Sequence, residues 1–136
     1  IICLERIQQR AVKAVSGLKG TTYEERLLEL GLPSLQDRRR EIDMVQTYKI
    51  VNKIDSDEPE QWFTRADSRR PTRQGDGKDR LLPVRSQHEY RKNFFSVRVI
   101  DEWNKLPDIT KEAANVGQFK RLYRRHRGLV APAGEL

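Results

Sequence analysis

The chain has 136 residues and a mass of 16.0 kDa, the size of one domain. Charged residues make up 35% of it, against about 25% in an average globular domain, so we expect only a thin hydrophobic core. Its net charge of +7 favours a polyanionic partner. No apolar run approaches about 18 residues, so we expect no membrane-spanning helix.

Cysteine and histidine are too scarce for two kinds of site. Cys3 is the single cysteine, which excludes an internal disulfide, and with only His88 and His126 besides it the chain lacks the Cys and His residues of a structural zinc site. We therefore expect Cys3 to be a small buried hydrophobe and the protein to need no metal or cofactor. We also expect an intracellular protein, in the nucleus and/or the cytoplasm, with no membrane partner and no small-molecule substrate. Because the chain begins at Ile1 and its one methionine is Met44, we expect it to be an excerpt from a longer polypeptide.

Residues 1–17 have the periodicity of an amphipathic helix. Its outer stripe is basic, consisting of Arg6, Arg10 and Lys13, and its end is predicted between Gly17 and Gly20 because glycine tolerates a positive φ. The residues of the apolar face are Leu4, Ile7, Ala11, Ala14 and Val15.

The next two helices have recognisable starting residues. Thr22 with Glu25 three positions later forms a predicted capping box, and Gly31 ends that short helix. Ser34 followed by Asp37 predicts an N-cap with an acidic first turn.

The longest helix is predicted from residue 35 to about residue 53. Its apolar residues cover more than half of the circumference, which predicts that it lies at the centre of a bundle and is contacted on at least two sides. These apolar residues are Leu35, Ile42, Met44, Val45, Tyr48 and Val51. The narrow polar strip consists of Arg39, Arg40, Asp43, Gln46 and Thr47.

Residues 55–92 have little apolar periodicity and many Pro, Gly, Asp and Arg residues, which predicts a long polar loop or a partly disordered linker. The pair Trp62 and Phe63 and the segment 81–84 are the expected points where this loop contacts the rest of the protein.

The segment 94–107, FFSVRVIDEWNKLP, fits two patterns. Alternating apolar residues favour a strand, but a helical stripe covers more residues and stops before Pro107. We therefore predict a helix capped by Asn93 or Ser96, with a short extended lead-in at residues 94–95. Trp103 is its expected anchor in the core.

A last helix is predicted from about Asn115 to residue 127, with Gln118 completing another capping box. One face carries Val116, Phe119, Leu122, Tyr123 and His126. The other face carries Lys120, Arg121, Arg124, Arg125 and Arg127.

The predicted fold class is mainly α: a small irregular helical bundle of about five helices. We divide it into a three-helix segment over 1–54, the polar loop over 55–92, a helical pair over 93–127 that docks on the first segment, and a frayed tail over 128–136.

We find no sequence motif for catalysis. There is no glycine-rich phosphate loop, zinc-protease motif or nucleophile elbow, and His126, on an apolar helix face, is expected to be a packed or snorkelling side chain rather than a catalytic one. What remains are cations that could neutralise phosphates along a nucleic-acid backbone without reading bases. The candidate nucleic-acid-binding residues are Arg6, Arg10, Lys13, Arg39, Arg40, Lys120, Arg121, Arg124 and Arg125. The alternative is that these stripes are ordinary solvated helix faces.

Two strings carry a family resemblance: GLPSL…RRR…YKI over 31–50 and YRKNFFSVRVIDEWNKLP over 90–107, followed by FKRLYRR. In order and spacing, residues 3–125 resemble the C-terminal region of the reverse-transcriptase polyprotein of non-LTR retrotransposons (LINE elements), of the chicken-repeat-one and Jockey-like group. The resemblance is weak over 64–80 and absent after Gly128.

The resemblance implies that residues 1–54 are thumb or post-thumb helices and that the rest is a C-terminal extension. It implies that Arg6, Arg10, Lys13, Arg39 and Arg40 are thumb contacts and that the cations over 120–125 belong to the extension. The paired aspartates of the polymerase palm and the endonuclease are missing, so the chain is expected not to be an enzyme by itself.

The expected partners are RNA and/or DNA and the polymerase body of the parent polyprotein. Two alternatives to nucleic-acid binding stay open. In the first, the chain is a structural module that docks onto that polymerase body or self-associates. In the second, it is an inactive retrotransposon relic.

Overall fold

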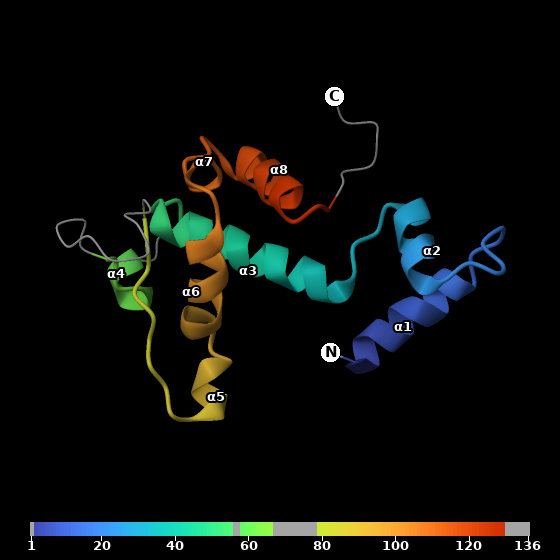
Figure 1. Cartoon of the computed structure of the whole chain (residues 1–136), viewed down its shortest axis with the longest axis horizontal. Helices are drawn as coiled ribbons and strands as arrows, with labels where there is room; N and C mark the ends of the chain where they lie inside the picture. The colour runs from blue at the N-terminus through green and yellow to red at the C-terminus, as the bar shows by residue number, and fades with distance from the viewer. Residues whose placement is uncertain (1, 56–57, 67–78, 130–136) are drawn as a thin grey trace.

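A computed structural model describes residues 2–55, 58–66 and 79–129. The predicted fold class is confirmed, because the described residues form eight helices and no strand (Figure 1). The helices are α1 (Ile2–Lys13), α2 (Tyr23–Leu30), α3 (Leu35–Val51), α4 (Pro59–Trp62), α5 (Glu89–Lys92), α6 (Phe95–Lys105), α7 (Asp108–Lys111) and α8 (Val116–His126). Five of them are expected from the sequence, and the four-residue helices α4, α5 and α7 are not. The predicted frayed tail lies, from residue 130 onward, outside the described residues.

Local capping chemistry decides where α2 and α3 begin. Thr22 and Glu25 form the predicted capping box, and Gly31 ends α2 in the left-handed conformation at φ 63°. The Ser34 side chain accepts from the backbone N–H of Asp37 at 3.1 Å, as predicted for the start of α3.

The start of α8 departs from the predicted capping box. Asn115 accepts from the backbone N–H of Gln118 at 2.8 Å, so it is the N-cap. The Gln118 side chain accepts instead from the backbone N–H of Ala114, one residue before the cap.

The 94–107 segment is a helix, so the alternative of a strand is wrong. Its predicted cap is also wrong, because Phe94 is the N-cap in an extended conformation and makes no side-chain hydrogen bond there. Asn93 instead ends α5 and donates from its side chain to the carbonyl of Glu89, while Ser96 already lies within the first turn of α6.

The core lies where α6 and α8 both pack against α3, which confirms that α3 is contacted on two sides. Four aromatic rings form its centre. Phe119 of α8 stacks on Tyr48 of α3 at 4.5 Å between ring centroids and on Trp103 of α6 at 6.1 Å, and Tyr123 follows at 6.2 Å. Trp103 is fully buried, as expected of an anchor.

Two residues of α3 lie on the side opposite to the predicted one. Thr47, expected in the polar strip, is fully buried, and Ile42, expected on the apolar face, is 59% exposed. At 100° per residue Thr47 falls between Ile50 and Val51, both of which are buried. Its hydroxyl donates to the backbone carbonyl of Asp43, and this hydrogen bond lets a polar residue sit in the core.

The described parts of the polar loop are anchored on α6. Phe63 and Leu81 are buried, as expected of contact points, whereas Trp62, Leu82 and Val84 remain exposed. The Asn104 side chain accepts from the backbone N–H of Leu81 and donates to its carbonyl, and the Trp103 indole N–H donates to the carbonyl of Asp79.

The helices α1 and α2 pack on each other, apart from the core (Figure 1). Their buried apolar residues are Val12, Leu18 and Leu27, and none of these belongs to the cluster around Trp103. The predicted apolar face of α1 is therefore wrong as a packing surface, because α2 covers the side that carries Val12. All of Leu4, Ile7, Ala11, Ala14 and Val15 are exposed.

Candidate nucleic-acid interface

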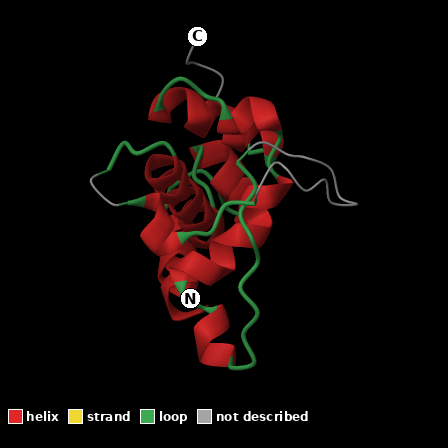
Figure 2. Ribbon diagram, turned by 90° about the vertical axis from the view of Figure 1, so that its left-hand side faces the viewer, coloured by secondary structure: helices red, strands yellow, loops and turns green. Residues whose placement is uncertain are grey.

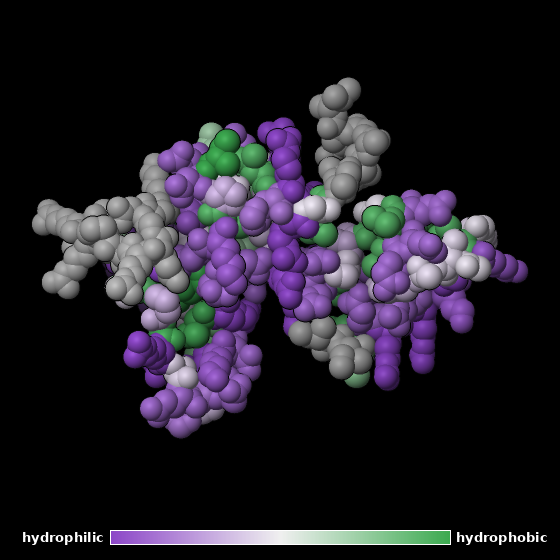
Figure 3. Space-filling model, viewed as in Figure 1, coloured by the Kyte–Doolittle hydropathy of each residue, from purple (hydrophilic) through white to green (hydrophobic). Residues whose placement is uncertain are grey.

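The cationic stripe of α1 is exposed. Arg6, Arg10 and Lys13 follow each other at i, i+4 and i+7 and therefore share one face of the helix. All three are exposed, and no hydrogen bond or ion pair joins them to another described residue. Figure 3 shows hydrophilic side chains projecting from α1 on the side away from α2. This stripe is accessible to a phosphate backbone.

The helix α8 carries four cations and no carboxylate. Lys120, Arg121 and Arg125 are exposed and form no ion pair within the described chain. With no acidic side chain on the same helix to offset them, they form a local excess of positive charge.

Arg124 has a different environment from its neighbours on α8. Its guanidinium Nε lies 3.1 Å from both carboxylate oxygens of Glu41, and Nη2 lies 2.9 Å from Oε1. Glu41 belongs to α3 and is only 9% exposed. This bidentate hydrogen bond between guanidinium and carboxylate holds α8 against α3. Of the four cations predicted on α8 as ligands, Arg124 is therefore the one that supports the fold.

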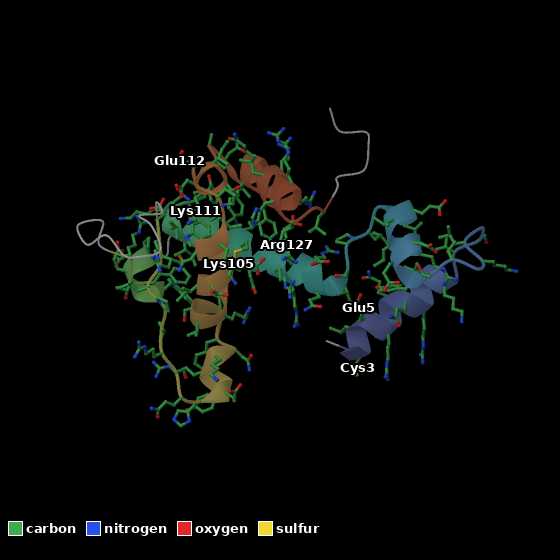
Figure 4. The ribbon with its side chains drawn as sticks, viewed as in Figure 1. Cys3, Glu5, Lys105, Lys111, Glu112 and Arg127 are labelled. Carbon is green, nitrogen blue, oxygen red and sulfur yellow. The ribbon has the colours of Figure 1, made fainter. Side chains whose placement is uncertain are left out.

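Arg127 also joins α8 to α3. Its Nη2 lies 3.2 Å from the Asp37 carboxylate, beside the start of α3 (Figure 4). The helical pattern assigns Arg127 to the cationic face, and Asp37 compensates its charge.

A groove of about 450 Å³ lies between α3 and α8. We call it the α3–α8 groove. Lys120 and Arg124 line it from α8, and Arg38 and Lys49 line it from α3. Glu41 is the one carboxylate among its lining residues. The cations of α8 thus face further cations of α3.

Arg38 and Lys49 are site residues that the sequence analysis missed. A signal for them is present, because Arg38, Ile42, Val45 and Lys49 follow each other at i, i+4, i+7 and i+11. That spacing places the two cations on one helix face with two apolar residues between them. This stripe was missed because the sequence pattern assigned Ile42 to the buried face of the helix.

The predicted residues Arg39 and Arg40 do not line the α3–α8 groove. Arg39 is exposed, and Arg40 borders a second hollow of about 430 Å³ between α3 and α6. Three carboxylates line this hollow, those of Asp43, Asp101 and Glu102, and Arg98 contacts both oxygens of Asp43 at 2.9 and 2.8 Å. This hollow is consequently less attractive to an anion than the α3–α8 groove, which has one lining carboxylate.

Lys111 is a buried cation that the sequence pattern did not reveal. It is 2% exposed, and its ammonium lies 5.9 Å from the centroid of the Trp103 ring. Burial lowers the pKa of Lys111 from its usual 10.5, while the charge of Asp108 acts in the opposite direction. Figure 4 labels Lys111 at α7. Because its side chain is buried, Lys111 is unsuited to contact a nucleic acid.

The expected burial of Cys3 is wrong, because Cys3 is exposed. His126 is also exposed, so of its two expected environments the packed one is wrong. Within the described ranges, no group of three or more His, Cys, Asp or Glu residues could hold a metal ion. None of the described helices is long and apolar enough to cross a bilayer.

No family model, curated protein or solved structure matches this chain. The helix α1 packs on α2, whereas α8 packs on α3 and α7, so the cations of α1 and α8 form two separate surfaces.

Proposed function

We propose that this chain is a non-catalytic nucleic-acid-binding portion of a LINE-type reverse transcriptase, which contacts the backbone of RNA or of a primer–template duplex. The observation that carries the proposal is the set of cations on α8 without an ion-pair partner in the described chain, Lys120, Arg121 and Arg125. Lys120 also lines the α3–α8 groove, together with Arg38 of α3. Exposed cations of this kind bind phosphates and release counterions. The resemblance of the sequence to the LINE family supports the same partner.

The salt dependence of binding tests the proposal. We expect binding to a fluorescent primer–template duplex, measured by anisotropy, to weaken steeply between about 50 and 200 mM salt. Replacing Lys120, Arg121 and Arg125 by Ala should lower the slope of log K against log salt by about 0.7–0.9 for each phosphate that is no longer neutralised. Arg124 is left unchanged in this variant because it holds α8 on α3.

A charge-matched control separates a site from net charge. Lys19→Ala, Lys53→Asn and Lys105→Ala remove the same number of charges from scattered exposed positions, and Asn tolerates the positive φ of 55° at Lys53. This control should keep nearly the wild-type slope. The absence of binding at low salt, or equal slopes for both triple variants, would contradict the proposal.

A second candidate function is suggested by the apolar surface of α1. Leu4 is 54% exposed and Ile7 is 61% exposed, and α2 does not cover them. As this second function, we propose that α1 docks onto the polymerase body of the parent polyprotein. The resemblance to the LINE family implies that this body precedes the present region.

Co-purification with the upstream palm fragment tests this docking function. Leu4→Ser with Ile7→Ser should abolish the complex, whereas Arg6→Ser with Arg10→Ser, on the cationic side of the same helix, should preserve it. A complex unaffected by the first pair rules out docking through α1, and a wild-type chain that only forms dimers points to a second copy as the occupant.

A further inference from the structure

Three aromatic rings lie together on the surface next to α5. The rings of His88 and Tyr90 are stacked, with 5.3 Å between centroids and 20° between planes. The Phe94 ring lies 6.5 Å from that of Tyr90. Tyr90 is 65% exposed and Phe94 is 56% exposed. We call these three residues the ring platform.

The ring platform is not explained by packing within the protein. No residue of α5 is buried, and the helix projects at the lower extremity of the molecule in two views at right angles (Figures 1 and 2). The neighbouring residue Phe95 provides a contrast, because its ring turns inward to contact those of Trp62 and Phe63. A cluster of exposed rings on a small protein typically marks an interaction surface.

The charge around the platform is positive. Residues 85–98 contain four cations and a single carboxylate, Glu89. Lys92 pairs with Glu89, and Arg98 pairs with Asp43. Arg85 and Arg91 are exposed and form no ion pair with any described residue. Two exposed cations near the rings in the sequence therefore remain for an anionic partner.

Rings combined with unpaired cations fit one class of ligand better than others. Single-stranded nucleic acid offers unstacked bases to aromatic side chains and phosphates to cations, and this stacking tolerates any base sequence. The bases of a duplex are already stacked inside the helix and expose only their edges. A duplex would therefore use the cations but not the rings.

We infer that His88, Tyr90 and Phe94 form a stacking platform for unpaired bases of single-stranded RNA or DNA, with Arg85 and Arg91 contacting the adjacent phosphates. The inference rests on the proposed function in that its partner is a nucleic acid. The ring platform adds a second contact region, on a different element from the cations of α8. It also predicts a preference for unpaired strands.

Binding of three probes tests the inference: oligouridine and oligothymidine of about twelve nucleotides, and a blunt duplex of the same length. The double variant Tyr90→Ala and Phe94→Ala should bind both single strands about tenfold more weakly or worse, since base stacking on each ring contributes substantially to affinity. Its affinity for the duplex should change by less than about twofold, because a duplex does not stack on the rings.

Three further variants complete the experiment. Tyr90→Phe keeps a ring and should retain single-strand binding, whereas Tyr90→Ala alone should lose part of it without altering Phe94, the N-cap of α6. Ile109→Ala removes another exposed apolar side chain, 67% exposed and on a different helix, and should behave as wild type. Circular dichroism should give equal unfolding midpoints for all variants.

The outcomes distinguish this inference from the proposed function. Wild-type affinity of the double variant for single strands, or an equal loss for single strands and duplex, overturns the ring platform while salt-dependent duplex binding still supports the proposed function. Failure of the wild-type chain to bind any of the three probes overturns both, and the rings would then be assigned to a protein partner.

Discussion

At the scale of single residues, Trp103 makes the most consequential contacts in the core. Its ring stacks on Phe119, its indole N–H donates to the carbonyl of Asp79, and no part of it is exposed. Because α6, α8 and the end of the polar loop all meet at this side chain, a smaller residue would leave a cavity and an unpaired carbonyl together.

Trp103→Ala should lower the free energy of unfolding by about 3–5 kcal/mol. Trp103→Phe keeps a ring for Phe119 but loses the hydrogen bond to Asp79, so its loss should be smaller. Urea unfolding followed by circular dichroism measures both. Wild-type stability of the Ala variant would show that the core does not depend on this anchor.

Two buried tyrosines, Tyr48 and Tyr123, and the partly buried Tyr23 predict sensitivity to alkali. Burial raises the pKa of Tyr48 above 10.0, and burial together with the hydrogen bond donated to Glu102 raises that of Tyr123. For Tyr23, burial and then the hydrogen bond to Glu5 raise the pKa to about 12. Since a tyrosine in the unfolded chain ionises near 10.0, the unfolded state loses protons first.

Stability should therefore be constant below pH 10 with respect to these groups and fall as the pH rises above it. Tyr123→Phe should reduce this fall, although it loses the hydrogen bond to Glu102. Urea midpoints between about pH 8 and pH 11.5 measure the effect, with tyrosinate absorbance as a second readout. An equally steep fall in the variant would assign the effect to other groups.

At the scale of elements, the ion pair between Arg124 and Glu41 supports the contact of α8 with α3. Glu41 is 9% exposed and contacts Arg124 through both oxygens, so removing Arg124 leaves a poorly solvated carboxylate. Arg124→Ala should cost about 1–3 kcal/mol of stability, whereas Lys120→Ala, at an exposed position of the same helix, should cost less than about 0.5 kcal/mol.

A double-mutant cycle with Glu41→Ala isolates the pair. The two losses should be coupled by about 1 kcal/mol or more if the side chains act on each other across the helix contact. Additive losses in thermal or urea unfolding would mean that Arg124 stabilises α8 by another route, and it would then return to the candidate ligands.

At the scale of the whole molecule, the packing differs from the division into consecutive segments. That division groups residues 1–54, but the core cluster combines α3 with α6 and α8 and contains no residue of α1 or α2. The expected docking of the C-terminal pair takes place on α3.

This grouping predicts opposite effects of two truncations. A chain that lacks residues 1–32 should still unfold cooperatively with a similar midpoint, because its core cluster is complete. A chain that lacks residues 93–136 exposes Met44, Tyr48 and Val51 of α3 and should aggregate. Gel filtration and circular dichroism measure both, and an unfolded first fragment would show that α1 and α2 are needed for the core.

Patterns in the sequence were informative where the determining contacts are local. The starts of α2 and α3 and the end of α2 follow from residues within one turn of each other, such as Thr22 with Glu25. The cap of α6 was not predictable in this way, because Asn93 already ends the adjacent helix α5. The three cations of α1 needed only helical spacing to be placed on one face.

By itself, the sequence determined the helical class, the five main helices, the positive charge and the anchor Trp103. Helical periodicity and capping depend on neighbours within four residues, so these features can be read directly. Only the tertiary structure decided that α1 is half uncovered, that Thr47 is buried, that Glu41 neutralises Arg124 and that the rings beside α5 remain exposed. An amphipathic pattern states which side a helix can bury but not whether a partner reaches it, and that depends on contacts between residues as distant in the chain as Glu41 and Arg124.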